Sequence, residues 1–367
     1  MAGNRYRFAF ALVTMALAML SAAVAGEGVL RLAGYEPRIK NVMHYYANHD
    51  KYGWVIQPNL HARKISTSEG DYSISTDSEG FRIPESGVSD SNGGIILVVG
   101  DSYTFGMDVQ YTDGYYSQIE TLLASSGTRL RTRTVGIPGW SPFQYRDRVD
   151  DYLESEDSKQ LRCIILGLTL GNDLDPPPDP AAFEQAKPFI EDGYLVGDWK
   201  TGHVRAPWQE EGLLRRLLFA VETETATGSL AARAASQPVV RPLFESIGLA
   251  RRVGTLAPEF LGKSSTKKGW NSTLPVLLDI GRISSRREIP LIILLIADPA
   301  QFYLPEKDRF YVNEVVRRDL RAHDILFADP SLQLSLADYN RGSPHWNVEG
   351  HRKAANALVP VLRSVVH

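Results

Sequence analysis

Five short strand-like runs, most of them apolar and separated by amphipathic segments, set the pattern of the chain from residue 95 onward. Short apolar runs bounded by glycine or polar residues are typical of buried strands in a parallel sheet. The expected strands are Ile95–Val99, Leu130–Val135, Cys163–Leu168, Leu291–Ile296 and Ile325–Ala328, and helical spacing predicts helices over Tyr111–Leu123, Ser141–Leu153, Asn271–Ser285, Asn313–Ala322 and Gly350–Val365. Because strands and helices alternate, we predict right-handed crossovers and a three-layer α/β sandwich around a parallel sheet of about five strands.

The N-terminal region carries an apolar run of about eighteen residues, Phe8 to Ala25, which is near the minimum for a membrane span. Residues 1–34 are therefore expected to be a signal peptide or an uncleaved signal anchor. Ala23-Val24-Ala25 has the small-x-small pattern of a cleavage site, but the helical pattern continues beyond it and favours the anchor. Either form exports the rest of the chain, and basic residues before the run place the N-terminus in the cytoplasm. A buried N-terminal helix is the alternative.

Two regions flank and interrupt the strand-and-helix pattern. Residues 35–94 are polar and rich in turns, and we expect an N-terminal extension that packs on the main domain at 95–367. Within it, Asp71–Thr76 alternates like a half-exposed strand and predicts a hairpin beside the sheet, with Arg82 a candidate ion-pair partner. Residues from about 175 to 268 begin with a proline-rich break and are interpreted as an insertion. This insertion is expected to form either a lid or substrate groove over the sheet's edge or a solvated helical decoration.

Composition narrows the class of protein. The 367 residues are 43% hydrophobic and 23% charged, as in ordinary globular proteins, with a formal net charge of −3. No long basic stripe with interleaved aromatic residues is present, which excludes a nucleic-acid binder. The single cysteine, Cys163, permits neither an intrachain disulfide nor a cysteine-based metal site and is expected to be a small core residue.

The first predicted strand runs directly into Gly100-Asp101-Ser102. Ser102 is therefore expected at the carboxyl edge of the sheet, the usual place for a binding crevice in open α/β folds. A hydroxyl group there is accessible, and nearby main-chain N–H groups can face a developing anion. The same turn would also serve simply to cap a helix. This stretch alone supports a nucleophile and a cap equally.

Three later stretches follow in chain order, each near the end of a predicted strand or the start of a helix. They are Gly136-Ile137-Pro138-Gly139 after the second strand, Gly171-Asn172-Asp173 after the third, and a block from His345 to His351 before the last helix. With Gly-Asp-Ser, these stretches resemble the signature blocks of the SGNH, or GDSL-type, hydrolase superfamily. The resemblance covers about residues 70–365, with a poorly matching middle section.

The resemblance implies a role for each of four positions. Ser102 matches the nucleophile and His345 the proton-transferring base, whereas Gly139 and Asn172 match the donors that stabilise an oxyanion. His351, in the same block as His345, is interpreted as structural. The family's fold is flavodoxin-like and its chemistry needs no metal or organic cofactor. Similar membrane-anchored relatives act on O-acetyl groups of cell-surface polysaccharides.

The chain departs from the family pattern just before His345. The family places an aspartate two or three residues before this histidine, whereas Ser343 and Gly342 stand at those positions. Three explanations are open: Ser343 or a main-chain carbonyl holds the imidazole, another acid such as Asp338 replaces the aspartate, or the site binds without turnover. In a serine protease, loss of the triad acid lowers turnover by about four orders of magnitude. Which of the three explanations holds therefore decides how active the site is.

Three interpretations of the function follow. The first is an exported serine esterase, membrane-anchored through its N-terminal helix or secreted if that helix is cleaved, with its catalytic domain in the periplasm or outside the cell. Its substrate is an acylated small molecule or an acetylated polysaccharide, and its acyl acceptor is water or a sugar hydroxyl. The second is a catalytically weak or inactive module that binds envelope polysaccharide or a partner protein. A third interpretation, an intracellular lipid or thioester hydrolase, requires that residues 1–34 do not target the chain.

Overall fold

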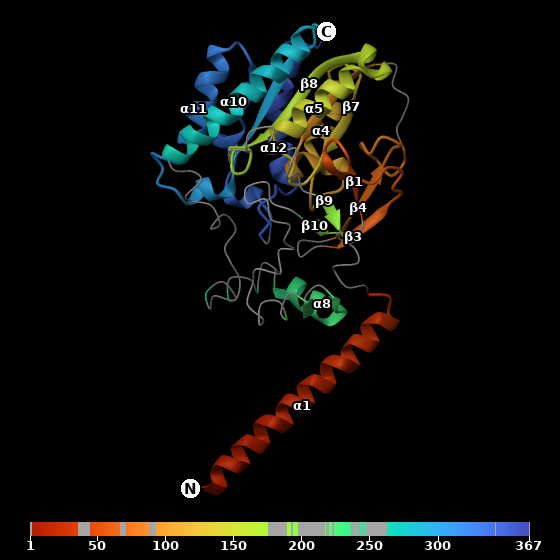
Figure 1. Ribbon diagram of the computed structural model, residues 1–367, viewed down its shortest axis with the longest axis vertical. Coiled ribbons are helices and arrows are strands. Elements are labelled where there is room, and N and C mark those ends of the chain that lie inside the picture. The colour runs from red at the N-terminus through yellow and green to blue at the C-terminus, as the bar shows by residue number, and fades with distance from the viewer. Residues whose placement is uncertain are drawn as a thin grey trace.

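A sheet of eight strands, in the order β12-β11-β8-β6-β7-β5-β4-β3, is the centre of the fold in the computed structural model (Figure 1). The structure describes residues 2–35, 45–66, 71–87, 93–174, 189–191, 194–196, 224–235, 263–341 and 343–366, and a few single positions between 217 and 246. The parallel strands are β6 (Gly94–Gly100), β7 (Leu130–Gly136), β8 (Leu161–Thr169), β11 (Leu291–Ile296) and β12 (Leu326–Ala328). These are the five strands expected from the sequence, and their spatial order is that of a flavodoxin-like sheet. The predicted α/β class and parallel sheet are confirmed.

Alternate residues of the central strands face opposite helical layers. In β6, Ile95, Leu97 and Val99 lie in one core with α5 (Pro142–Leu153), α10 (Lys263–Ser285) and α11 (Tyr311–Ala322). Ile96 and Val98 lie in the other core, with α4 (Tyr115–Ala124), α12 (Val348–Arg363) and the buried Cys163. Both faces of β6 are buried, which explains why its sequence is continuously apolar. Truncating one such side chain to alanine removes about 2–5 kcal/mol from the free energy of unfolding.

Three antiparallel strands from the N-terminal extension make the sheet larger than the expected five. β5 (Arg82–Ile83) pairs with β7 through Arg82 and Thr134, and β4 (Asp71–Thr76) and β3 (Arg63–Ser66) continue outward from it. The predicted strand at 71–76 is therefore joined to the main sheet by hydrogen bonds. β5 has only two residues, too few for an alternating pattern to be visible.

Smaller hairpins complete the described strands. β1 (Tyr46–His49) pairs with β2 (Gly53–Ile56), and β9 (Phe189–Glu191) pairs with β10 (Tyr194–Val196). Most of the insertion at about 175–268 lies outside the described residues, so its role as a lid or a decoration stays a prediction.

Helix α1 (Ala2–Leu32) runs away from the body of the fold (Figure 1). Its stretch Val13–Leu32 is long and apolar enough to cross a membrane, and none of this stretch is buried in the structure. The helix continues without a break past the small-residue sequence at 23–25. A signal peptide and an anchor both fit this length, so the helix itself does not distinguish them.

Trp54 of β2 ties the N-terminal extension to the turn that follows β7. Its indole Nε1–H donates to the carbonyl oxygen of Pro138 at 3.0 Å, and the indole of Trp140 donates back to the carbonyl oxygen of Trp54 at 2.9 Å. Both rings are buried. This reciprocal pair of hydrogen bonds, called here the Trp54 clamp, therefore holds the Pro138 turn against the extension.

The Trp54 clamp leads to a stability prediction. Trp54→Phe removes the buried donor to Pro138 and leaves that carbonyl without its partner, so the free energy of unfolding should fall by about 1–3 kcal/mol. Urea unfolding followed by circular dichroism measures the change. Leu332→Ala, at a position that is 72% exposed, is the control and should leave stability unchanged. Equal stability of Trp54→Phe and the unsubstituted chain would contradict the clamp.

Candidate active site

Ser102 is the first residue of a short helix that begins directly after strand β6. This helix, α3 (Ser102–Phe105), is N-capped by Asp101, whose side chain accepts a hydrogen bond from the backbone N–H of Tyr103 at 3.0 Å. The residue that caps the helix is thus Asp101, and Ser102 itself stays partly exposed. The carboxyl edge of the sheet therefore presents a serine hydroxyl on a capped turn.

His345 reaches Ser102 from 243 positions further along the chain, with its Nε2 atom 2.8 Å from Ser102 Oγ. Tyr103 holds the histidine loop, because its hydroxyl donates to the carbonyl oxygen of Pro344 at 2.6 Å. The Tyr103 ring also meets the imidazole edge-on, with centroids 5.1 Å apart. The backbone N–H of Asn340 donates to the His345 carbonyl oxygen at 2.8 Å. The structure thus brings the expected nucleophile and base into hydrogen-bond contact.

Asn172 lies beside the same turn, at the end of strand β8. Its side-chain amide donates to Asp101 Oδ2 at 3.0 Å. Asp101 is fully buried, and this burial raises the pKa of its carboxyl group, while the hydrogen bonds from Asn172 and Tyr103 oppose the shift. Because a side-chain amide has two N–H donors, one N–H orients Asn172 and the second can serve an oxyanion.

Asp173 braces the turn that carries Asn172. Its carboxylate accepts hydrogen bonds from the backbone N–H of Thr169 at 2.8 Å and from the hydroxyl of Tyr145 at 3.1 Å. Burial raises the pKa of Asp173 well above its ordinary value. The hydroxyl of Thr273 donates to the Asp173 carbonyl oxygen at 2.7 Å. These contacts make Asp173 a structural residue of the turn.

Gly139 lies in the turn after β7 with a φ of 85°, a left-handed conformation that favours glycine. The end of β7 packs directly on helix α3, since a Cβ atom at Gly136 would lie 2.0 Å from the backbone nitrogen of Phe105. The Trp54 clamp holds the other side of the turn. Gly139, the expected oxyanion donor, therefore lies three residues after the point where β7 meets the helix that Ser102 begins.

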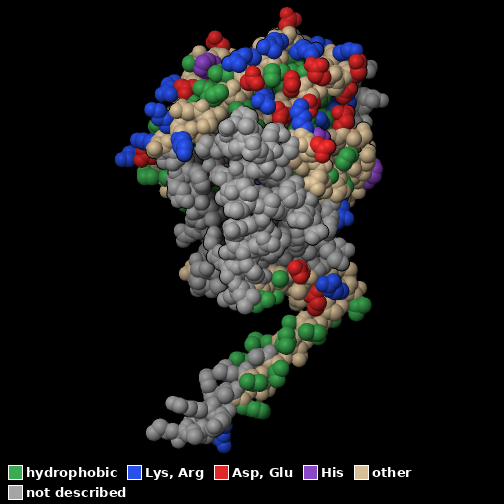
Figure 2. Space-filling view, viewed as in Figure 1, with side chains coloured by type: hydrophobic (Ala, Val, Ile, Leu, Met, Phe, Trp, Pro, Cys, Tyr) green, Lys and Arg blue, Asp and Glu red, His purple; other side chains and the backbone are tan. Residues whose placement is uncertain are grey.

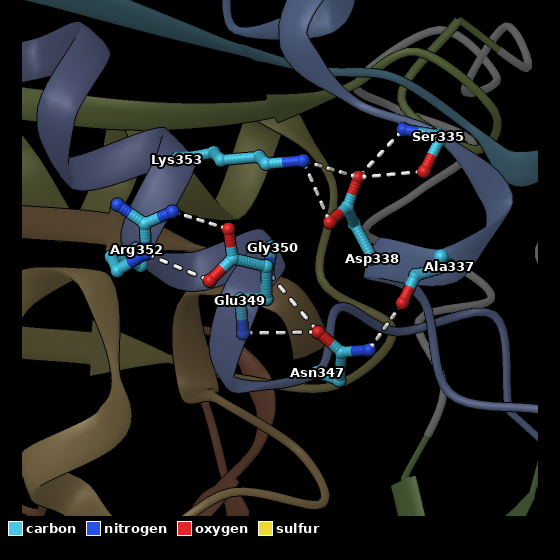
Figure 3. A network of polar contacts seen from close by, with 8 residues as sticks. All are labelled: Ser335, Ala337, Asp338, Asn347, Glu349, Gly350, Arg352 and Lys353. Atoms are coloured by element: carbon cyan, nitrogen blue, oxygen red, sulfur yellow. Dashed lines mark hydrogen bonds and ion pairs between the residues drawn. The ribbon is translucent and has the colours of Figure 1, made fainter.

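Asp338, named in one of the three explanations as a replacement acid, has other partners in the structure. Asp338 Oδ2 accepts hydrogen bonds from the backbone N–H of Ser335 at 2.7 Å and its hydroxyl at 3.1 Å, and it pairs with Lys353 Nζ at 2.8 Å (Figure 3). The Asp338 side chain is 3% exposed and points into this network. Closeness in sequence to His345 suggested Asp338, but its carboxylate is bound by Ser335 and Lys353.

Two other groups lie at the far nitrogen of the imidazole. Ser343 Oγ is 2.5 Å from His345 Nδ1, as one of the three explanations expected, and Asp108 Oδ2 is 3.8 Å from the same nitrogen. Asp108 is not among the acids expected from the sequence, because it lies far from the histidine along the chain. No local pattern in the sequence marks this acid.

His351 is buried and has a structural role, unlike His345. Its Nδ1 accepts a hydrogen bond from the backbone N–H of Tyr115 at 3.3 Å, and the two rings stack with centroids 5.9 Å apart. Burial, which disfavours the charged form, lowers the pKa of His351 to about 3. It packs the start of α12 on α4, in agreement with its structural interpretation.

Comparison with known proteins gives the chain's structural neighbours. No model of a known family matches the sequence, and no curated protein matches it. Among solved structures, the chain is similar to the Clostridium thermocellum family 3 carbohydrate esterase (14% identity over 75% of this chain and 100% of that chain, TM-score 0.38). It is also similar to a member of the lipolytic G-D-S-L family from Veillonella parvula (13%, 73% and 98%, 0.36) and to AlinE4, an SGNH-hydrolase family esterase (17%, 65% and 77%, 0.33).

Two of these structures are named as members of the SGNH or G-D-S-L family, whose motifs the sequence resembles. At identities of 13–17%, the likeness to these structures is one of fold alone.

The buried imidazole of His351 leads to a pH prediction. The unfolded chain binds a proton on this side chain below its ordinary pKa of 6.5, whereas the folded chain does so only near pH 3. The contribution of the neutral, buried His351 to stability should therefore be fully present above pH 6.5. On acidification the free energy of unfolding should fall, by at most about 1.4 kcal/mol per pH unit from this group. Urea unfolding of His351→Gln between pH 4 and 7 should show a smaller slope than the unsubstituted chain. His323→Gln, at an exposed position, is the matched control, and identical slopes for all three chains would contradict the prediction.

Proposed function

We propose that the chain is a serine esterase of the SGNH type. The observation that carries this proposal is the 2.8 Å contact between His345 Nε2 and Ser102 Oγ at the carboxyl edge of the sheet. A serine hydroxyl is a weak nucleophile unless an adjacent base accepts its proton. The second ring nitrogen of His345 is held by its own neighbours, which is the arrangement a proton-transferring histidine needs.

The mechanism follows from the placed groups. Ser102 Oγ attacks the ester carbonyl carbon while its proton passes to His345 Nε2. The oxygen of the tetrahedral intermediate receives hydrogen bonds from the backbone N–H groups of Ser102 and Gly139 and from the amide of Asn172. His345 then returns the proton to the leaving alcohol, and an acyl group remains on Ser102. Water, or a sugar hydroxyl, attacks this acyl-serine by the reverse sequence and frees the serine.

The proposed substrate is an O-acyl ester, above all an O-acetyl group on a cell-envelope glycan. Its support is the resemblance of the four sequence blocks to membrane-anchored relatives, together with the N-terminal helix. The alternative, a module that binds such a glycan without turnover, is favoured by one observation, the serine that stands at position 343 in place of the family's aspartate.

We also propose that helix α1 is retained as a membrane anchor. Glu27, just after the small-residue sequence at 23–25, accepts hydrogen bonds from the backbone N–H groups of Ala226 and Thr227 at 3.0 and 2.9 Å. These residues begin α8 (Ala226–Ala235), so Glu27 caps the N-terminus of that helix. Hydrophobic side chains follow the projecting part of α1, and charged side chains cover the opposite end of the molecule (Figure 2). Cleavage after residue 25 would leave Glu27 on a frayed terminus, whereas retention keeps the cap on a continuous helix.

Covalent labelling tests the esterase. We expect the full chain in detergent micelles to react with a fluorophosphonate probe and to hydrolyse p-nitrophenyl acetate. Ser102→Ala should abolish labelling because the attacking atom is gone, and His345→Ala should lower the hydrolysis rate by about 10³-fold or more. Asp319→Asn, on α11 and away from Ser102, is the control for folding. A folded, unsubstituted chain that neither labels nor hydrolyses the ester would favour the glycan-binding module.

The intact mass of the membrane-extracted protein tests the anchor. We expect a mass that includes residues 1–25, and a mature chain beginning at Gly26 would overturn the proposal. Glu27→Ala should leave the chain in the membrane but remove the cap of α8, at a cost of about 1 kcal/mol, and so raise the proteolysis rate within 224–235 about five-fold. Glu314→Ala, at an exposed position, is the matched control and should not change that rate.

A further inference from the structure

We propose that Asp108 is the positioning carboxylate for His345, supplied from the nucleophile's own loop in place of the acid that stands just before the histidine in related sequences. This inference rests on the proposed esterase function. It assigns the negative charge of the site to a residue outside the four motif blocks.

The imidazole of His345 lies between the carboxylate of Asp108 and the hydroxyl of Ser102. Asp108 Oδ2 lies 3.8 Å from His345 Nδ1, and the opposite ring nitrogen, Nε2, lies 2.8 Å from Ser102 Oγ. The side chains of Asp108 and His345 are 3% and 12% exposed. Water therefore screens their interaction only weakly.

The loop that carries Asp108 is fixed by the buried Arg82 of β5. The Arg82 guanidinium donates hydrogen bonds to the carbonyl oxygens of Gly106 and Val109, both at 2.9 Å, and also to that of Phe105. Arg82 thus acts here through hydrogen bonds to the backbone, and its expected role as an ion-pair partner stays a prediction. Asp108 has a φ of 67°, a left-handed conformation that aspartate and asparagine tolerate better than most residues. The position of the carboxylate is therefore determined by backbone contacts on both sides of it.

Other acids face the same imidazole but have other tasks. Asp101 receives the hydrogen bonds of Tyr103 and Asn172, and Asp298, after β11, accepts the backbone N–H of Ala300 at 2.7 Å. Burial raises the pKa of Asp101 and Asp298, and the charge of His345 opposes both shifts. These two carboxylates are used as caps, whereas Asp108 stands at ion-pair distance from Nδ1.

Ser343 and Asp108 divide the work that one aspartate does in the family pattern. Ser343 Oγ, at 2.5 Å from Nδ1, can accept the Nδ1–H and so select the tautomer in which Nε2 takes the serine proton. A neutral hydroxyl stabilises the imidazolium that forms as Ser102 attacks less than a carboxylate does. The charge of Asp108 supplies that stabilisation, so its removal should act on the chemical step and leave substrate binding intact.

The test is steady-state hydrolysis of p-nitrophenyl acetate by the full chain in detergent micelles. Asp108→Asn keeps the size and the left-handed preference of the residue but removes its charge. We expect kcat to fall about 10²- to 10³-fold and KM to stay within about threefold. Asp338→Asn, which alters the nearest acid before the histidine in sequence, is the matched control and should keep kcat within about threefold of the unsubstituted chain.

A rescue separates positioning from a structural defect. Ser343→Asp places an acid where related sequences have one, and it should restore at least about tenfold of the lost kcat in the Asp108→Asn background while adding little to the unsubstituted chain. Asp108→Gly, which also tolerates a positive φ, should show the same loss and the same rescue if Asp108→Asn does not fold.

The outcomes distinguish this inference from the proposed function. An active unsubstituted chain with Asp108→Asn within threefold of its kcat would overturn the role of Asp108 and leave the esterase standing. A loss in Asp108→Asn and Asp108→Gly that Ser343→Asp does not relieve would also overturn it. An inactive, unlabelled and folded unsubstituted chain would overturn the esterase itself.

Discussion

The site depends on strand β6 being paired on both sides and buried on both faces. β6 is parallel to β7 on one side and to β8 on the other, so all three strands end at one edge of the sheet. That shared edge brings together the turns of Ser102, Gly139 and Asn172, which are scattered over seventy residues of sequence. A shift of one residue in either pairing would exchange the two faces of β6 and misplace Asp101, which caps α3 and holds Asn172. The chemistry is thus positioned by core packing before any polar contact is considered.

The N-terminal extension takes part in this positioning. Trp54 holds the turn of Gly139, and Arg82 holds the loop of Asp108. Both side chains are buried, so each fixes its loop without competition from water. Residues that precede the first parallel strand therefore set the distances around a serine that follows it. Truncation of the extension would leave the strands of the parallel sheet in place but would remove the contacts that hold the loops of Gly139 and Asp108.

The parallel strands and the Ser102–His345 pair could be predicted from the sequence because each has a local signal. Buried strands are continuously apolar, and the four motif blocks stand at strand ends in chain order. Asp108 and β5 have no such signal. The two residues of β5 are too short for a period, and Asp108 is one of many acids whose relation to His345 exists only after the chain has folded. Asp338 failed for the converse reason, since it is close to the histidine in sequence but is bound to Lys353.

Because Asp108 lies on the loop of the nucleophile, the loop that carries His345 must be held in place relative to both Ser102 and Asp108. When acid and base share one loop, they move together and their contact survives small displacements of that loop. Here a movement of residues 339–347 would separate His345 from Ser102 and from Asp108 at the same time. The loop is correspondingly well fastened, with Tyr103 bonded to the Pro344 carbonyl and the hydroxyl of Tyr339 bonded to the Ala297 carbonyl at 2.7 Å. The first fastening comes from α3 and the second from the end of β11, so the same sheet edge that positions the nucleophile also positions its base.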